Sequence, residues 1–398
     1  MLETGRSARR GSLSSKLDLV SASGIRRFFE LIDTTDGVIS LGVGEPDFST
    51  PSHISQAAIR SIEAGKTAYT SNSGLFELRE LIAAQIERRY GVSYDPQNEI
   101  IVTTGVSEAL NLATQALLDD GDEVLSTDPS YVAYMPTVVF AGGRYVTVPV
   151  HAANGFMLEA ERLEQHITPQ SKAVLLGYPA NPTGAVMDRP SLQAIAGVAE
   201  RHNLFVISDE IYDRLVYGVE HVSFPSLPRM KDRTVLLGGF SKAYAMTGWR
   251  LGYVCASQQI TDAMMRVHQY VMMSAPTAAQ YAALEALETG EEDVQGMLGE
   301  YARRRELVIK ACRDMGLELS EPHGAFYAFP SIKSTGLDDE EFAGRLLLEE
   351  KVAVVPGQAF GPGGDGHVRI CYAQKYELLE EALHRMARFV HHYRTASK

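Results

Sequence analysis

Residues 241–252 decide the fold, and they read SKAYAMTGWRLG. The stretch follows the short apolar run 235–237, which has the length of a buried strand, so it is expected to be the loop after that strand. Lys242 is the only lysine in it, and Arg250 stands eight residues further on. An arginine can bind a phosphate through two parallel hydrogen bonds. The stretch therefore predicts a strand end that presents an amine beside an anion-binding guanidinium.

Strand and helix signals alternate on both sides of this stretch. Apolar runs of buried-strand length occur at residues 99–103, 123–126, 173–176, 204–207 and 235–237. Helical segments such as 107–118 and 191–202 lie between most of them. This rhythm is typical of a largely parallel sheet with helices on both faces, so the central part of the chain is predicted to be an α/β domain.

The pattern changes after residue 291. A long charged helix at 294–315 is followed by strand-like runs around 326–329 and 352–355 and by a C-terminal amphipathic helix. This shift predicts a second lobe. At the other end, the first twenty residues are rich in Ser and Arg and lack the apolar region of a secretory signal. They are expected to form a solvated tail rather than a transit peptide.

The composition is that of a globular protein, because 45% of the 398 residues are apolar and 22% are charged. Lys and Arg number 37 and Asp and Glu number 50, so the formal net charge is −13. Nucleic acids and anionic membranes are poor partners for such a chain. The three cysteines are far apart, so neither a disulfide framework nor a metal site is expected. No apolar stretch reaches the ~18 residues of a membrane helix, and we expect a cytoplasmic enzyme.

Polar side chains follow five of the predicted strands at the point where each strand ends. They are, in chain order, Ser107 at a helix start, Tyr131, Asn181, the pair Asp209 and Tyr212, and Lys242. Ligands bind beyond the carboxyl ends of the strands of such a sheet, so these side chains are predicted to meet at one rim. The helix start at Ser107 suits a phosphate, since it presents unpaired N–H groups.

An amine beside a carboxylate, a phenol, an amide and a phosphate seat is what pyridoxal phosphate (PLP) requires. The chain contains no GxxxxGK[ST] motif, which excludes a P-loop. Gly361, Gly363 and Gly366 match GxGxxG, but they lead into a strand-like run rather than a helix, so the match is interpreted as coincidence.

Five segments together resemble the class I and II PLP-dependent aminotransferases of fold type I, the aspartate aminotransferase superfamily. Residues 241–252 resemble the lysine segment of that family. The other four segments are 40–48 (SLGVGEPDF), 181–184 (NPTG), 208–212 (SDEIY) and 366–370 (GHVRI). The resemblance runs from about residue 23 to about residue 390 and is specific because all five segments occur in the family's order and spacing.

The resemblance implies an α/β fold with a large domain, built on a mostly parallel seven-stranded sheet, and a smaller α/β domain formed by both termini. The implied boundaries are a flexible tail at 1–20, an N-terminal segment of the small domain at 21–48, a large PLP-binding domain at 49–290 and a C-terminal small domain at 291–398. A homodimer with composite active sites is also implied, in which Tyr69 reaches the cofactor phosphate of a neighbouring subunit.

The resemblance assigns catalytic roles to three residues of the rim. Lys242 is expected to form a Schiff base with PLP and, once displaced by the substrate amine, to move a proton from Cα. The alternative is a solvated surface lysine. Asp209 is expected to pair with the pyridine nitrogen and so to have a depressed pKa, although it could equally cap a following helix. Tyr212 and Asn181 are expected to bind the cofactor's phenolic oxygen, the alternatives being a tyrosine at the edge of the core and a turn-forming asparagine.

The implied phosphate seat consists of the backbone amides of Val106 and Ser107, the hydroxyls of Ser107 and Ser241, and the guanidinium of Arg250. Many relatives carry a serine three residues before the lysine, where this chain has Gly239, so one phosphate hydroxyl is missing.

Three residues are expected to contact the ring or the substrate. Tyr131 is expected to stack on the cofactor ring rather than to be a core aromatic. Arg369 is expected to hold the substrate α-carboxylate bidentately, with Asn181 and the Gly44 backbone beside it; the alternative is an exposed arginine on a strand. Some aspartate-specific members carry an arginine before a Ser-Asn-Pro-Pro run, and residues 273–276 read MSAP instead.

The resemblance therefore implies an aminotransferase that moves the amino group of an aromatic amino acid, or of a broad range of L-amino acids, to a 2-oxo acid such as 2-oxoglutarate. Aspartate, alanine and N-acyl-diaminopimelate aminotransferases remain alternatives, as does a PLP β-lyase on the same fold. A PLP-containing transcription regulator is disfavoured, because no helix-turn-helix segment precedes residue 40.

Overall fold

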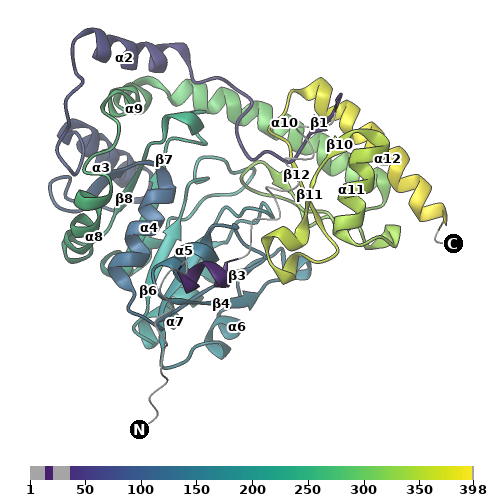
Figure 1. Ribbon diagram of the computed structural model, residues 1–398, viewed down its shortest axis with the longest axis horizontal. Helices are drawn as coiled ribbons and strands as arrows, with labels where there is room; N and C mark the ends of the chain where they lie inside the picture. Colours follow the sequence, from purple (N-terminus) through teal and green to yellow (C-terminus); the bar gives the residue numbers. More distant parts are fainter. Residues whose placement is uncertain (1–13, 21–35, 397–398) are drawn as a thin grey trace.

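The structure is a computed structural model that describes residues 14–20 and 36–396. Its centre is a seven-stranded sheet with the strand order β2-β8-β7-β6-β5-β3-β4 (Figure 1). The strands are β2 (Ile100–Thr103), β3 (Glu123–Asp128), β4 (Arg144–Pro149), β5 (Ser171–Gly177), β6 (Phe205–Asp209), β7 (Thr234–Gly239) and β8 (Gly252–Cys255). Only β8 runs antiparallel to its neighbours, which confirms the mostly parallel sheet of the predicted α/β fold.

Successive residues of these strands face opposite sides of the sheet, as the strand period of two requires. In β5, Val174 and Leu176 belong to the core beneath α6 and α7, whereas Leu175 belongs to the core beneath α4 and α8. Both faces are therefore buried, which explains why the strands are continuous apolar runs. The helices of this part are α2 (Ser52–Glu63), α3 (Phe76–Tyr90), α4 (Gly105–Leu117), α5 (Tyr134–Phe140), α6 (Ala160–Gln165), α7 (Arg189–Arg201), α8 (Gln258–Val271) and α9 (Thr277–Thr289).

The second part of the molecule combines the C-terminal quarter of the chain with a short N-terminal strand. Its elements are α10 (Glu291–Met315), α11 (Asp339–Glu350), α12 (Tyr376–Ala396), β1 (Ile39–Ser40), β9 (Tyr327–Ala328), β10 (Val352–Ala353), β11 (Val355–Pro356) and β12 (Val368–Cys371). The strands β11, β12 and β9 form an antiparallel sheet, and β1 pairs in parallel with β10. Both ends of the described chain thus meet in one lobe, as predicted.

One strand prediction for this lobe was wrong in detail. The run 352–355 is two strands rather than one, because the chain changes partner: Val352 pairs with Ile39, whereas Val355 pairs with Arg369. The GxGxxG match does lead into a strand, β12. The domain boundaries at residues 20, 48 and 290 stay predictions. Of the predicted tail, residues 1–13 lie outside the described part, and Ser15–Leu19 form a short 3-10 helix.

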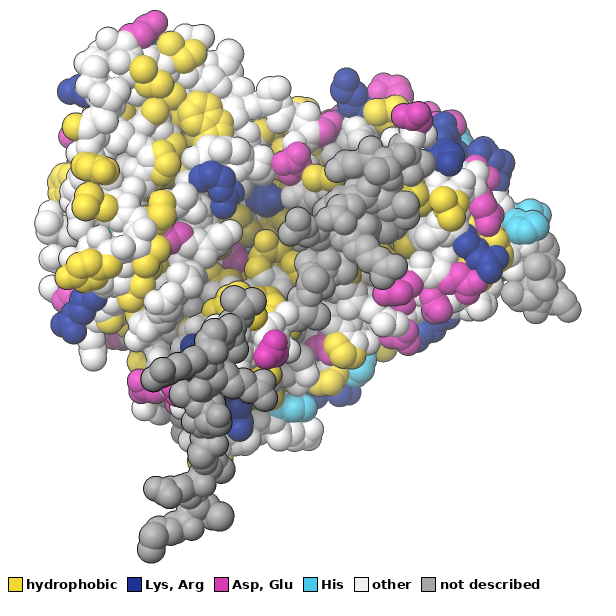
Figure 2. Space-filling view, in the orientation of Figure 1, with side chains coloured by type: hydrophobic (Ala, Val, Ile, Leu, Met, Phe, Trp, Pro, Cys, Tyr) yellow, Lys and Arg dark blue, Asp and Glu magenta, His cyan; other side chains and the backbone are white. Residues whose placement is uncertain are grey.

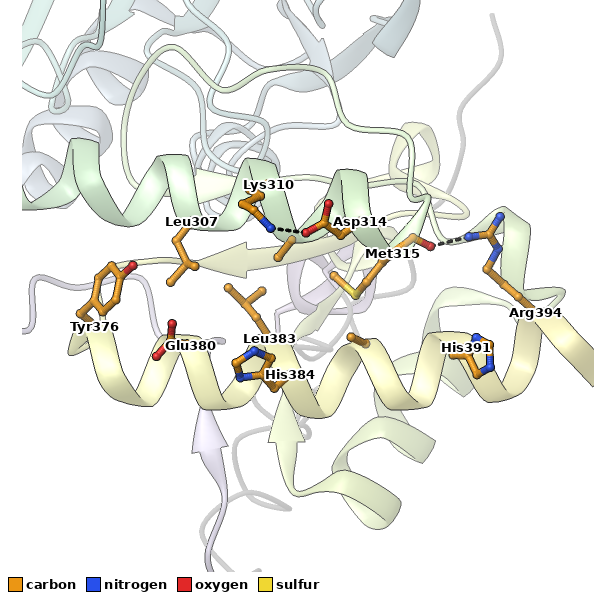
Figure 3. Close-up of a pocket in the computed structure, with 12 residues that line it drawn as sticks. Leu307, Lys310, Asp314, Met315, Tyr376, Glu380, Leu383, His384, His391 and Arg394 are labelled. Carbon is orange, nitrogen blue, oxygen red and sulfur yellow. Dashed lines mark hydrogen bonds and ion pairs between the residues drawn. The ribbon is translucent and has the colours of Figure 1, made fainter.

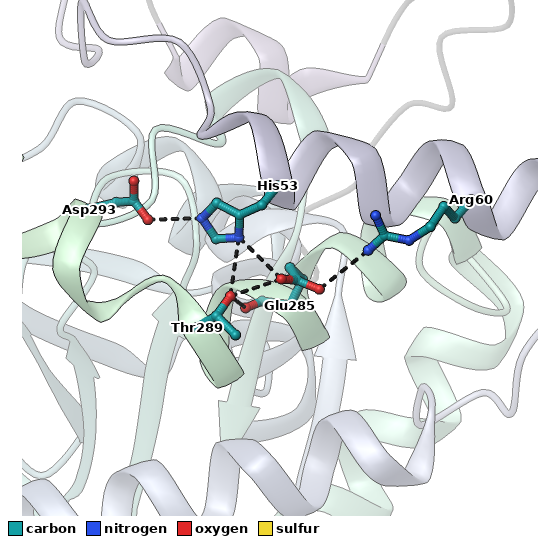
Figure 4. A network of polar contacts seen from close by, with 5 residues as sticks. All are labelled: His53, Arg60, Glu285, Thr289 and Asp293. Atoms are coloured by element: carbon teal, nitrogen blue, oxygen red, sulfur yellow. Dashed lines mark hydrogen bonds and ion pairs between the residues drawn. The ribbon is translucent and has the colours of Figure 1, made fainter.

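A polar network fastens α2 to the helices that connect the two parts (Figure 4). His53 of α2 bonds Asp293 of α10 at 2.9 Å through Nε2 and Glu285 of α9 at 3.2 Å through Nδ1. The hydrogen bond to Asp293, joined by that to Glu285, outweighs desolvation and raises the pKa of His53 above its ordinary value. Arg60 also reaches Glu285. The network therefore anchors α10 near its first turn.

A surface groove of about 810 Å³ lies between α10 and α12 (Figure 3). Leu307, Met315 and Leu383 contribute apolar side chains to it, and the Lys310–Asp314 ion pair lies on α10 beside it. No residue of the predicted rim lines this groove. Within the described residues, none of the helices combines the length and hydropathy that a membrane crossing requires.

Candidate active site

A cavity of about 430 Å³ opens where the parallel strands of the large sheet end. It contains almost every residue predicted for the site: Gly44, Val106, Ser107, Tyr131, Asn181, Asp209, Tyr212, Ser241, Lys242, Arg250 and Arg369. Tyr69 does not line it, and the side chain is 79% exposed. Figure 2 shows basic and hydrophobic side chains around the hollow between the two parts of the molecule. The rim predicted from five strand ends therefore exists.

Lys242 lies in the turn that follows β7 and points into the cavity. Its Nζ donates a hydrogen bond to the Gly44 carbonyl at 2.6 Å and lies 5.6 Å from the centres of the Tyr212 and Phe326 rings. Burial lowers the pKa of Lys242 to about 8, because desolvation penalises the charged amine. The interpretation as a solvated surface lysine is thus wrong. A buried amine with this pKa is suited to act as a nucleophile and as a base near neutral pH.

Asp209 closes β6 as a buried carboxylate. Its Oδ2 accepts a hydrogen bond from the Tyr134 hydroxyl at 2.9 Å, and its Oδ1 accepts one from the Ile211 amide at 3.3 Å. Residues 211–214 form turns and not a helix, so the alternative role as a helix cap is wrong. Burial raises the pKa of Asp209 to about 6 despite both hydrogen bonds. The depression expected when Asp209 pairs with the pyridine nitrogen stays a prediction. Burial therefore disfavours the ionised form of Asp209, and a cationic partner would stabilise that form.

We expect Asp209→Asn to raise the unfolding temperature of the cofactor-free chain at pH 8. Since the folded pKa lies above the ordinary 3.8, ionised Asp209 disfavours the folded state, and this penalty grows as the pH rises from about 4 to about 6. At about 1.4 kcal/mol per pH unit the full penalty is about 3 kcal/mol. Thermal unfolding of both proteins between pH 4 and pH 8 measures it, with the exposed Asp119→Asn as control. A stability difference that does not shrink toward pH 4 would show that burial is not the cause.

The start of α4 and the residues before β8 lie together at one corner of the cavity, an arrangement that could bind an anion. Because β8 is antiparallel, its first residue, Gly252, pairs with the last residues of β2 and β7, and Arg250 reaches the same edge. A Cβ atom on Gly252 would stand 2.8 Å from the Val106 nitrogen, so glycine permits this close approach. A Cβ atom on Gly105 would stand 2.8 Å from Nη2 of Arg250. The Arg250 guanidinium therefore lies against the first turn of α4, whose amides have no acceptor within the helix.

Neighbouring side chains leave little room for a side chain at position 239, where this chain has a glycine. A Cβ atom there would meet Ile211 at 3.0 Å and Val106 at 3.2 Å. These two apolar side chains occupy the space that a larger residue would need. Ser241, two residues further along the loop, is buried and carries the hydroxyl group that Gly239 lacks.

Arg369 of β12 is 4% exposed, which overturns the alternative of an exposed arginine. Its Nη1 donates to Asn181 Oδ1 at 2.8 Å and its Nη2 donates to the Gly42 carbonyl at 2.6 Å. Its Nε is buried without a hydrogen-bond partner. The guanidinium lies over the rings of Tyr327 and Phe360, at 4.5 Å and 4.8 Å from their centres. A buried guanidinium with a free donor beside a cavity fits a carboxylate ligand.

Two tyrosines of the site, Tyr327 and Tyr134, were not predicted from the sequence. The Tyr327 hydroxyl lies 2.8 Å from that of Tyr212, and it stands where a Cβ atom on Gly44 would fall. The Tyr134 hydroxyl donates a hydrogen bond to Asp209, and the Tyr134 ring contacts the Tyr131 ring edge to face. The sequence offered only weak signals: Tyr327 lies in a strand-like run of the second lobe, and Tyr134 follows the rim residue Tyr131 by one turn.

The chain is similar over nearly its whole length to known aminotransferases. Residues 36–386 match the family model described as aminotransferase class I and II. Aromatic-amino-acid aminotransferase 2 of Thermococcus litoralis is 44% identical over 94% of this chain and 97% of its own. The aspartate aminotransferase of Pyrococcus abyssi is 46% identical with the same coverage. The solved aromatic aminotransferase of Pyrococcus horikoshii superposes with a TM-score of 0.91, 44% identity, and coverage of 96% of this chain and 99% of that one.

These matches agree with the amine, the buried carboxylate and the corner at the start of α4 that converge in the cavity, a set of groups that fits PLP. The chain is a member of the class I and II aminotransferases, PLP-dependent enzymes of the aspartate aminotransferase-like fold.

Proposed function

We propose that this enzyme transfers the amino group of an L-amino acid, aromatic or of broad range, to a 2-oxo acid such as 2-oxoglutarate. The observation that carries the proposal is that Lys242, Asp209 and Arg369 line one cavity. The three supply an amine, a buried anion and a carboxylate-binding cation. A cytoplasmic location is part of the proposal.

Each group of the cavity has a task in this reaction. Lys242 would hold PLP through Nζ and, when free, would take the proton from the substrate's Cα. Asp209 would pair with the cofactor's ring nitrogen, and Tyr212 and Asn181 would hold its phenolic oxygen. When bound, PLP supplies the electron sink that stabilises the negative charge left on Cα. Arg369 holds the substrate carboxylate, so that the Cα–H bond is the one presented for cleavage.

The remaining residues hold the cofactor in place. The amides of Val106 and Ser107 bind the phosphate together with the hydroxyls of Ser107 and Ser241 and with Arg250. Tyr131, which is 37% exposed at the cavity, stacks on the cofactor ring.

The lining of the cavity supports an aromatic or broad amino donor. Among the described lining residues the cations are Lys242, Arg250 and Arg369, each of which already has a task. A second carboxylate, such as that of aspartate, would have no further cation in this lining. Val43, Leu110 and Val132 instead offer apolar contacts. Aspartate, alanine and N-acyl-diaminopimelate remain the alternative donors, since the named relatives include both aromatic and aspartate enzymes.

The near-visible absorbance of the purified enzyme tests the proposal. Tyr, Phe, Asp, Ala and Glu are added singly without an acceptor. Conversion of the yellow band to that of the pyridoxamine form establishes amino transfer, and the rank order of donors gives the specificity. Release of ammonia and pyruvate from a β-substituted amino acid, without any acceptor, would instead establish a β-lyase.

We also propose a homodimer in which Tyr69 completes the phosphate seat of the partner subunit, since it is exposed and lies outside the cavity of its own chain. Tyr69→Phe is expected to weaken PLP retention about tenfold or more, the effect of one lost hydrogen bond to a charged group. PLP that remains after gel filtration measures it, with the 87% exposed Tyr270→Phe as control. Unchanged retention would place Tyr69 outside the site.

A further inference from the structure

A buried, hydrogen-bonded pair of side chains adjoins the residues of the proposed phosphate seat, and neither of the two lines the cavity. His268 of α8 is fully buried, and its Nδ1 lies 2.7 Å from Oε1 of Glu108, which is itself 8% exposed. Its Nε2 lies 2.9 Å from the Asn72 carbonyl oxygen. A carbonyl oxygen accepts, so Nε2 carries a hydrogen, and one further proton is held between Nδ1 of His268 and Oε1 of Glu108. The pair as a whole therefore carries no net charge.

The pair joins two segments that belong to different parts of the proposed site. On one side, Oε2 of Glu108 accepts a hydrogen bond from the Thr104 amide at 2.5 Å. Thr104 directly precedes α4, so Glu108 satisfies the amide that precedes the helix and leaves those of Val106 and Ser107 for the phosphate.

On the other side, Asn72 lies in the loop that carries Tyr69. That loop is held by His268 at Asn72, by the Gln280 amide, which donates to the Thr70 hydroxyl at 3.0 Å, and by the Val102 amide, which donates to the Ser73 carbonyl at 3.0 Å. The anchoring fixes the loop against α8 and β2.

The pair acts on the proposed phosphate seat mainly through the charge of Glu108. A carboxylate one turn into a helix whose N-terminus receives a phosphate would repel that phosphate and oppose the helix dipole's attraction for it. The proton held between His268 and Glu108 cancels this charge inside the protein. The pair thus lets Glu108 shape the seat without an electrostatic penalty.

We propose that His268 is a positioning residue that neutralises Glu108 behind the phosphate seat and fixes the loop bearing Tyr69 to the same helix terminus. This inference rests on the proposed phosphate seat. Removing both side-chain charges together distinguishes a charge-compensating role from a purely structural one, because the two roles predict opposite changes in PLP affinity.

The test compares His268→Gln, Glu108→Gln and the double variant, each as cofactor-free protein titrated with PLP and with pyridoxal, which lacks the phosphate. We expect His268→Gln to weaken PLP affinity about tenfold, because Glu108 is left uncompensated, and to change pyridoxal affinity less than about twofold. The double variant is expected to recover PLP affinity to within about threefold of the wild type. The ³¹P resonance of bound PLP should shift in His268→Gln and return in the double variant.

Two results would overturn the inference. A double variant that binds PLP no better than His268→Gln, or PLP and pyridoxal affinities that fall together, would mean that the pair only supports the fold. If His268→Gln does not fold, Glu108→Gln decides alone: we expect its PLP affinity to equal or exceed that of the wild type, and a clear loss would refute charge compensation. Equal wild-type affinities for PLP and pyridoxal would instead refute the phosphate seat itself.

Discussion

Lys242→Ala is expected to lower turnover by at least about 10⁴-fold, the largest effect of any single substitution in this chain. The change removes the amine that attaches the cofactor and the base that takes the Cα proton, and general acid–base catalysis alone contributes up to about 10⁴-fold. No other lysine lines the cavity in the part of the chain that the structure describes. A water molecule in the space left by the side chain is too weak a base to replace it.

The experiment measures steady-state turnover with the best amino donor, together with near-visible absorbance. The matched control is Lys310→Ala, a 71% exposed lysine on α10 that pairs with the neighbouring Asp314. Thermal unfolding shows whether the Lys242 variant is folded, since the substitution leaves a cavity. A folded variant with normal turnover would overturn the central assignment.

Arg369→Lys is expected to lower kcat/KM for amino acids about 10²-fold, mainly through KM. The loss follows from geometry, since an ammonium cannot reproduce two parallel hydrogen bonds to a carboxylate and simultaneously satisfy Asn181 and the Gly42 carbonyl. Truncating one partner of a buried charged pair costs about 2–5 kcal/mol, which corresponds to a factor of about 30 or more.

A substrate without a carboxylate separates this role from a structural one. Slow conversion of an aromatic amine that lacks the α-carboxylate should be nearly equal in the wild type and in Arg369→Lys, whereas conversion of the corresponding amino acid should differ strongly. The conservative change at the exposed Arg266 serves as control. Equal losses for the amine and the amino acid would show that Arg369 supports the fold of the site and does not bind the carboxylate.

Residues directly after apolar strand runs could be located from sequence, because the direction of a parallel strand fixes the edge at which its end emerges. Lys242, Asp209 and Asn181 were found in this way. The antiparallel strand β8 was missed, although Tyr253, Val254 and Cys255 form a short apolar run within it. Edge strand β4 was missed because only one of its residues is fully buried.

Other features depend on packing that a sequence does not display. The Tyr327–Tyr212 contact joins strand β9 to a turn after β6, and no local pattern pairs the two. The burial that raises the pKa of the Asp209 carboxyl group also depends on packing. The split of run 352–355 likewise depends on which partners the strands meet.

The parallel pairing of Ile39–Ser40 with Val352–Ala353 has a consequence for biosynthesis. The segment that carries Gly42 and Gly44 can be fixed in place only after β10 and β12 have left the ribosome, because Arg369 binds the Gly42 carbonyl. A nascent chain can complete its central sheet much earlier, since domains generally fold as units while synthesis continues. An N-terminal fragment that ends before β10 would therefore be a folded sheet with a lysine in place but with no means of holding a substrate carboxylate.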